Sequence, residues 1–311
     1  MLKAGRPSLH CSPFDCLNPM KSVTTGHNGR MGDTTSEPEI VGGAVPVATA
    51  IADLDELIWN PISTAAMARA HPRFDELVLD ACARDGASAL PTAELVGIGG
   101  LVDAVDESAE LIEIARERAG ERMPQLKLHV ADATTWETTG YDLVQCVLGV
   151  ASFPDLDAGT QHLIECAAPG GRVAITVWAP GALEPLRGLV ASALPDGDAA
   201  ADESDADEPD TGAADTAAAD AGALHSPGSL AHWLTGLGLI GVRAETVQRH
   251  LDLSDEIAWS LVLGTSLRDA LDDLDDDAVA AVRERFLATL AARGATSVDL
   301  TTLIAVGRRP A

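Results

Sequence analysis

Basic residues are scarce in this chain of 311 residues. It has 21 lysines and arginines against 48 aspartates and glutamates, and only three of the bases are lysines, so the formal net charge is −27. Proteins that bind nucleic acids or anionic membranes present a basic face to the phosphate groups. The charge balance therefore argues against a nucleic-acid partner and against a membrane partner.

Paired cysteines, long apolar runs and several familiar catalytic motifs are also missing. The five scattered cysteines form no CxxC pair, which predicts reduced thiols in a cytoplasmic protein, with no disulfide framework and no metal site. No run approaches the roughly 18 apolar residues of a membrane span, and the first 40 residues lack the apolar segment of a secretory signal. HExxH, GxSxG and Walker motifs are absent. The aspartates at 275–277 precede a predicted helix, where they suit the helix dipole better than a metal ion.

Two segments of low complexity divide the chain. Residues 1–45 are rich in proline, glycine, serine and threonine, and we expect a disordered N-terminal extension there. Residues 196–223 hold ten acids and no base, so they cannot bury enough apolar surface to fold. We therefore expect one folded domain over residues 46–311, with a disordered acidic insertion at 196–223.

Within this domain, short apolar runs alternate with helical patterns. The clearest helix begins after Ser108, a plausible N-cap, and should end at Gly120. Alternation of this kind predicts βαβ units, and hence an α/β fold with a parallel sheet covered on both faces. The predicted strands are 76–81, 101–105, 126–130, 142–147, 172–177, 240–247 and 299–306. Further helices are predicted to open at Ser226 and to lie near 256–263 and 278–290.

Two glycine-bearing loops compete for the ligand site. A nucleotide-binding unit needs a helix and a strand, roughly 20 residues, between its loop and the acid that holds the ribose. Gly100 precedes Asp106 by only six residues, whereas Gly86 precedes it by 20. The working loop is therefore residues 80–86, and residues 97–100 form only the turn before the second strand.

With this register the chain resembles the class I S-adenosylmethionine-dependent methyltransferases of the bacterial small-molecule branch. VLDACARDG (78–86) falls at the family's V-L-D-x-G-x-G-x-G loop, and LVDAVDESAELIEIARERA (101–119) at its second strand and following helix. HVADATTW (129–136), YDLVQCVLGVASFPD (141–155) and APGGRVAITVW (168–178) match the next three strands. The resemblance implies a Rossmann-like fold with a mostly parallel seven-stranded sheet and helices on both faces. It makes residues 46–311 a methyltransferase-like domain.

The resemblance also implies S-adenosylmethionine as cofactor and gives its binding residues. Asp106, followed by Glu107, would hold the ribose, although Asp106 could instead be only an acid at a helix N-terminus. Asp132 would face the adenine beside Ala133, although it could be an ordinary turn aspartate. The remaining predicted residues are Asp80, Ala81, Cys82 and Gly86 along the methionine part, and Cys146 on the floor near the methyl group.

The loop departs from the family pattern at two of its three glycines. Cys82 and Arg84 stand there, and only Gly86 remains. Side chains at these positions either narrow the cofactor site, or the backbone keeps its path and Arg84 turns outwards.

The sequence therefore predicts a methyltransferase that acts on a small molecule. The alternative is a non-catalytic protein of the same fold that works as a binding or partner subunit. His162 and His225 flank segments that cover the site in the family. Tryptophans 178, 233 and 259 could wall an acceptor pocket or pack in the core. No catalytic residue is singled out, and the acceptor atom and the oligomeric state stay open.

Overall fold

The computed structural model describes residues 54–195 and 224–311. The N-terminal extension predicted at 1–45 and the acidic insertion predicted at 196–223 lie outside the described residues. Within the two described ranges, no helix is both long enough and apolar enough to cross a membrane.

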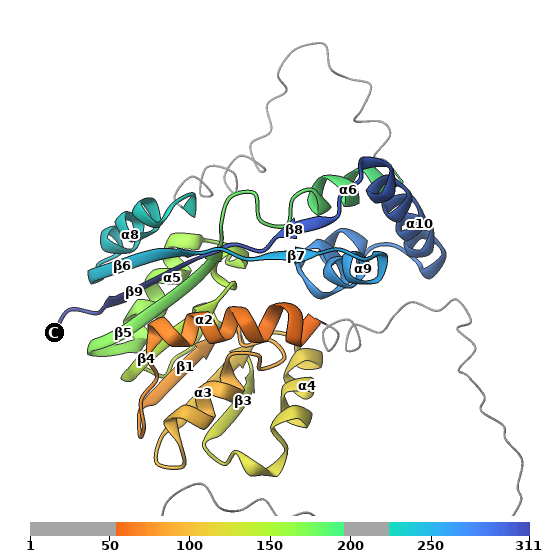
Figure 1. Cartoon of the computed structure of the whole chain (residues 1–311). Helices are drawn as coiled ribbons and strands as arrows, with labels where there is room; N and C mark the ends of the chain where they lie inside the picture. Colours follow the sequence, from red (N-terminus) through yellow and green to blue (C-terminus); the bar gives the residue numbers. More distant parts are fainter. Residues whose placement is uncertain (1–53, 196–223) are drawn as a thin grey trace, which may run out of the picture. The chain divides into compact units, whose positions relative to one another are not determined.

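A seven-stranded sheet lies at the centre of the described part of the chain (Figure 1). Its strands follow the order β3-β2-β1-β4-β5-β9-β6, and only β9 is antiparallel to its neighbours. This topology confirms the mostly parallel sheet predicted from the sequence. The strands are β1 (Leu77–Ala81), β2 (Leu101–Asp106), β3 (Leu126–Val130), β4 (Tyr141–Val147), β5 (Ala167–Trp178), β6 (Ile240–Val247) and β9 (Thr302–Arg308).

Helices cover both faces of this sheet, as predicted (Figure 1). One face carries α2 (Asn60–Ala70), α3 (Ala89–Val96) and α4 (Ala109–Ala119), and the other carries α5 (Leu156–Cys166) and α8 (Pro227–Gly236). The core under the first group is rich in alanine, which lets these helices lie close to the sheet. The core under the second group is built of larger aliphatic side chains such as Leu163 and Ile175.

The local signals around α4 act as the sequence predicts. The Ser108 hydroxyl accepts a hydrogen bond from the Leu111 backbone N–H at 3.3 Å, so it caps the first turn. Ile112, Ala115 and Ala119 are buried on the inner side of the helix. The helix ends at Gly120, whose φ of 57° few other residues tolerate, and a short 3₁₀ turn, η2 (Gly120–Arg122), follows.

Further helices stand over the ends of the central strands. We call α9 (Asp255–Gly264), η6 (Ser266–Leu271) and α10 (Asp276–Arg293) the cap. The cap shares a buried core with α6 (Leu186–Ala193) and with a π-helical turn, η1 (Asp55–Trp59), and Phe286 and Leu189 lie in this core. Asp275 is the N-cap of α10, since its carboxylate accepts from the Ala278 N–H at 2.9 Å.

The last predicted strand, 299–306, is wrong in its bounds. The structure has two strands here, β8 (Ser297–Asp299) and β9, and β8 pairs with β7 (His250–Asp252) outside the main sheet. The Asp299 carboxylate accepts a hydrogen bond from the Thr301 N–H at 2.8 Å and turns the chain. The apolar pattern continues through this turn because Leu300 is buried in the core under the cap, which is why periodicity alone missed the break.

Candidate functional site

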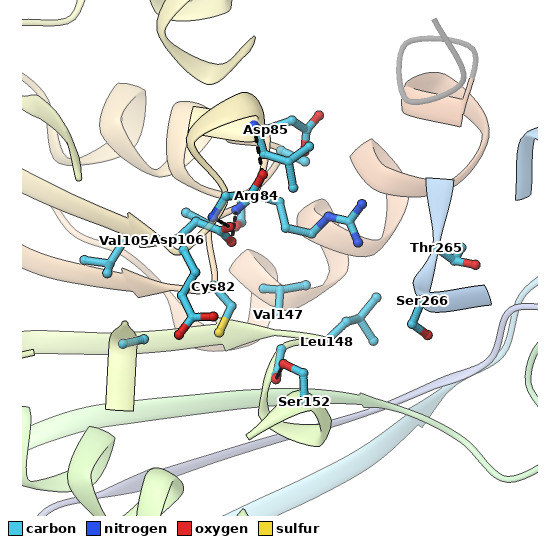
Figure 2. Close-up of a pocket in the computed structure, with 18 of the residues that line it drawn as sticks. Cys82, Arg84, Asp85, Val105, Asp106, Val147, Leu148, Ser152, Thr265 and Ser266 are labelled. Atoms are coloured by element: carbon cyan, nitrogen blue, oxygen red, sulfur yellow. Dashed lines mark hydrogen bonds between the residues drawn. The ribbon is translucent and has the colours of Figure 1, made fainter. Parts of the chain in front are cut away.

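A cavity of about 430 Å³ opens where the carboxyl ends of β1, β2 and β4 meet the cap (Figure 2). The chain winds from β1 toward β3 in one direction and from β4 toward β5 in the other, so β1 and β4 flank the switch point of the sheet. Ligands of open α/β sheets bind in this position. Loops after the strands form one wall of the cavity, and η6 and α2 form the other.

The loop after β1 keeps a backbone path that glycine favours. Cys82 and Arg84 have φ values of 58° and 50°, and Gly86 has 84°. A Cβ on Gly86 would lie 2.1 Å from the Leu90 Cδ1, so a larger residue would have to displace that side chain and also adopt the left-handed φ. Leu148, after β4, also borders the cavity with a φ of 65°. Strained conformations of this kind gather at functional sites.

The Arg84 side chain extends across the cavity toward the cap (Figure 2). One guanidinium nitrogen donates to the Gly264 carbonyl at 3.0 Å, at the carboxyl end of α9. The guanidinium also lies over the Trp59 ring, 5.4 Å from its centroid. The structure matches neither alternative in full, because the loop keeps its left-handed path but Arg84 does not turn outwards and instead lines the cavity.

Asp106 is fixed at the edge of the cavity by two backbone groups. Its Oδ2 accepts from the Arg84 N–H and its Oδ1 from the Ser108 N–H, each at 2.9 Å. A carboxylate oxygen can accept two hydrogen bonds, so each oxygen retains one free lone pair. Asp106 therefore joins the loop after β1 to the start of α4 and can still accept from a ligand.

Asp132 and Ala133 border the cavity beside Asp106. Asp132 is the N-cap of a 3₁₀ turn, η3 (Ala133–Thr135), and its Oδ1 accepts from both the backbone N–H and the hydroxyl of Thr134 at 2.7 Å. It is thus a turn aspartate that also lines the cavity.

The nine predicted cofactor residues fall into two groups. Those that line the cavity are Cys82, Asp106, Glu107, Asp132 and Ala133; those that lie outside its lining are Asp80, Ala81, Gly86 and Cys146. Asp80 is fully buried, and its Oδ2 accepts from the Gln145 amide at 3.0 Å while its Oδ1 has no partner among the described residues. Burial raises the pKa of Asp80 to about 7. All four residues of the second group are buried.

Cys146 lies close to Cys82 of the loop after β1. Both its sulfur and that of Cys82 lie beside Gly149, within 3 Å of the point where a Cβ on that glycine would stand. The contact with the Cys82 thiol and burial raise the pKa of the Cys146 thiol.

The tryptophans and histidines singled out in the sequence lie partly in the cavity wall and partly outside it. Trp178 lines the cavity, whereas Trp259 is buried in the core under the cap and Trp233 donates to Asp157 at 2.6 Å on the α5 side. His162 and His225 are not among the lining residues. His162 meets the Trp136 carbonyl at 2.9 Å instead.

Sequence reasoning missed the wall that faces the strand loops. It consists of residues from η1, α2 and the cap, among them Trp59, Ile62, Leu263, Thr265, Ser266 and Arg268. No motif marks these residues, because they meet the strand loops only through tertiary packing. Trp259 of α9, which the sequence offered as a wall of an acceptor pocket, lies near these residues in the chain but is buried in the core under the cap.

Comparisons with known proteins agree with this geometry. Residues 78–171 match the family described as "Methyltransferase domain". The chain is 30% identical over 270 residues to nocamycin O-methyltransferase of Saccharothrix syringae, which covers 81% of this chain and 92% of that protein. It is also 31% identical over 101 residues to 2-phytyl-1,4-naphtoquinone methyltransferase of a Nostoc species. That alignment covers 31% of this chain and 44% of the Nostoc protein.

A solved structure shares the fold. The crystal structure of a putative methyltransferase from Bacillus halodurans C-125 superposes with a TM-score of 0.50 at 14% identity, over 80% of this chain and 99% of that one. The identity with the Saccharothrix protein over nearly its whole length, together with the strand order of the sheet, decides the family. The chain belongs to the class I S-adenosylmethionine-dependent methyltransferases.

Proposed function

We propose that the chain transfers the methyl group of S-adenosylmethionine to an oxygen atom of a small molecule. The observation that carries this proposal is one cavity with two chemically different ends. Acidic residues and the left-handed loop border the end at β1, β2 and β3. Aromatic and aliphatic residues border the end under the cap, together with polar residues of η6 and the Arg84 side chain. The relative from Saccharothrix is by its name an O-methyltransferase, which supports oxygen as the acceptor atom.

The residues at the strand end fit this cofactor. Asp106 is held rigidly and keeps one free lone pair on each oxygen, which suits the two hydroxyls of a ribose. We propose that Glu107 assists there, and that Asp132 and Ala133 face the adenine. The loop with Cys82 would lie along the methionine part, with Asp80, Ala81, Gly86 and Cys146 supporting it from beneath. When bound, S-adenosylmethionine supplies an electrophilic methyl group on a positively charged sulfur.

The chain's own part in the reaction is to position the acceptor and to exclude water. Val147 and Leu148 form the floor between the two ends of the cavity. Trp59, Phe153 and Trp178 provide apolar walls for the body of an acceptor. Holding two reactants in line within a dry cavity supplies a large part of the rate in such displacements.

Arg84 has a positioning role in this proposal. Its guanidinium joins the loop after β1 to Gly264 of the cap and to Trp59 of η1. It also meets the carboxyl end of α9, where the helix dipole favours a cation. Arg84 therefore holds the cap over the strand loops, which a glycine at this position could not do.

We also propose a cytoplasmic location. Cys82, Cys146 and Cys166 are free thiols in the structure. Such thiols persist in reducing compartments, which supports this location.

Titration of the protein with S-adenosylmethionine in a calorimeter tests the proposal. Asp106→Ala should weaken binding by about 1–3 kcal/mol, because two ligand hydroxyls lose their acceptor. Asp155→Ala is the matched control, since Asp155 is an N-cap that accepts from the Ala158 N–H at 2.8 Å and does not line the cavity. This control should melt at a lower temperature and bind the cofactor as the unmodified chain does.

Two outcomes would contradict the proposal. Unchanged affinity in Asp106→Ala would remove the assignment of the ribose acid. A chain that binds no S-adenosylmethionine would instead be a partner or binding subunit that keeps the fold without the chemistry.

A further inference from the structure

Arg268 lies at the cap end of the cavity without a partner among the described residues. It belongs to η6, lines the cavity and is half-buried. Its guanidinium makes no hydrogen bond and no ion pair with any residue of the described ranges. Burying even part of a charge without a partner is costly, so this group calls for an explanation.

Arg268 differs from the other arginines that are removed from solvent. In residues 54–195 and 224–311, every other arginine that is buried or half-buried donates at least one side-chain hydrogen bond. These arginines are Arg69, Arg84, Arg118, Arg172, Arg249 and Arg309. The chain also carries 48 acids against 21 lysines and arginines, so acidic partners are plentiful. The lack of a partner at Arg268 is therefore not a shortage of acids.

A second guanidinium approaches the same segment from the opposite wall. Arg84 donates to Gly264, four residues before Arg268, and that bond uses one of its five N–H groups. Figure 2 shows Arg84 extending toward the segment of Thr265 and Ser266. The cap end of the cavity thus carries two cations against one carboxylate, that of Asp269, although the protein as a whole is strongly acidic.

The lining residues also limit how an acceptor can be activated. Among the described residues, they include no histidine and no lysine. Their carboxylates are those of Asp85, Asp106, Glu107, Glu110, Asp132 and Asp269. Asp85 pairs with Arg118, and Asp106 accepts two backbone hydrogen bonds. Carboxylates are weak bases, with ordinary pKa values of about 4. A neutral alcohol would need a strong base to remove its proton in the cavity. An acceptor that arrives already ionised needs none.

We infer that the acceptor is an oxygen acid bound as its anion, such as a phenolate, an enolate or a carboxylate, and that Arg268 holds this anion at the cap end. The inference rests on the proposed function. The ionised oxygen donates an electron pair to the methyl carbon, the bond between that carbon and sulfur breaks, and its electron pair stays on sulfur. The product is a neutral ether or ester, and no proton has to leave. Arg268 is thus a specificity-determining residue for the charge of the acceptor.

The test uses the full chain saturated with S-adenosylhomocysteine and a panel of probe pairs. Each pair is an aromatic hydroxy acid of one, two or three rings and its uncharged primary amide, for example 1-hydroxy-2-naphthoic acid and its amide. Binding is measured by calorimetry for the unmodified chain, for Arg268→Gln and for Arg268→Lys. Arg283→Gln is the control, because Arg283 is exposed on α10 and does not line the cavity.

We expect the unmodified chain to bind at least one acid about tenfold or more tightly than its amide. Arg268→Gln should abolish this preference and leave the affinities for the amide and for S-adenosylmethionine unchanged. Arg268→Lys should restore part of the preference, and Arg283→Gln should not alter it.

Three results would overturn the inference. One is that no acid in the panel binds better than its amide. A second is that Arg268→Gln weakens S-adenosylmethionine itself, which would make Arg268 a ligand of the cofactor carboxylate. The third is an undiminished preference in Arg268→Gln. Failure of the proposed function would be seen separately, as absence of cofactor binding by the unmodified chain.

Discussion

Glycine should stabilise the protein more than alanine does at position 82, the reverse of the usual order. Both substitutions remove the thiol and its contacts with Cys146 and Gly149, so these losses cancel in the comparison. With a φ of 58°, an alanine keeps the steric cost of the left-handed region, about 1–2 kcal/mol. Glycine avoids that cost but adds freedom to the unfolded chain, worth about 0.5–1 kcal/mol. Cys82→Gly should therefore exceed Cys82→Ala in stability by about 0.5–1 kcal/mol.

Urea unfolding of the two variants measures this difference. Ala83→Gly serves as the control, because Ala83 is buried in the same loop and has no positive φ. Glycine should cost stability there, by about 0.5–1 kcal/mol or more. If alanine equals or exceeds glycine at position 82, the loop does not follow the left-handed path, and the account of how it approaches a ligand fails with it.

Two further predictions concern buried charges. Burial raises the pKa of Asp80 to about 7, above its unfolded value of about 3.9, so the folded state holds more protons than the unfolded state between these values. The free energy of unfolding should therefore fall as the pH rises from about 4 to 7. Asp80→Asn should reduce this fall, measured by urea unfolding at pH 5 and pH 8. An equal fall in the variant would contradict the raised pKa of Asp80. Arg172 donates to both oxygens of Glu76, at 2.9 and 2.6 Å, and also to two carbonyls at the end of α2. Arg172→Met should lower stability by about 3–5 kcal/mol, because Glu76 loses its partner. A loss of less than about 1 kcal/mol in thermal unfolding would show that the pair is solvated.

The part of the site formed by the loops after the strands could be predicted, because its sequence signals are local. The glycine loop, the acid 20 residues later and the caps of α4 all depend on neighbours in the sequence, and the structure brings Cys82, Asp106 and Asp132 to one cavity. Strand and helix periodicity predicted the sheet in the same way. A turn that depends on one side chain, such as that of Asp299, does not change the apolar periodicity. The predicted bounds of the last strand are wrong for this reason.

The part of the site formed by the cap could not be predicted, because its contacts join residues that are far apart in the sequence. Arg84 meets Gly264, 180 residues later in the chain, and no pattern at either position announces the contact. The direction of the Arg84 side chain depends on this distant carbonyl and on Trp59. Arg268 is likewise an ordinary arginine in the sequence, and its lack of a partner becomes visible only when the surrounding residues are in place.

The ribbon formed by β7 and β8 bears on how such enzymes diversify. The chain leaves the main sheet beside the point where it returns, because His250 pairs with Asp299 and Asp252 with Ser297. The bond from the Leu253 N–H to the Thr296 carbonyl, 2.9 Å long, extends this ladder toward the cap. A segment whose two ends are already joined can be lengthened, shortened or replaced without moving the register of β6 or β9. If the cap selects the acceptor, recombination at this ribbon could exchange one acceptor range for another as a cassette, while the half of the fold that holds the methyl donor is inherited intact.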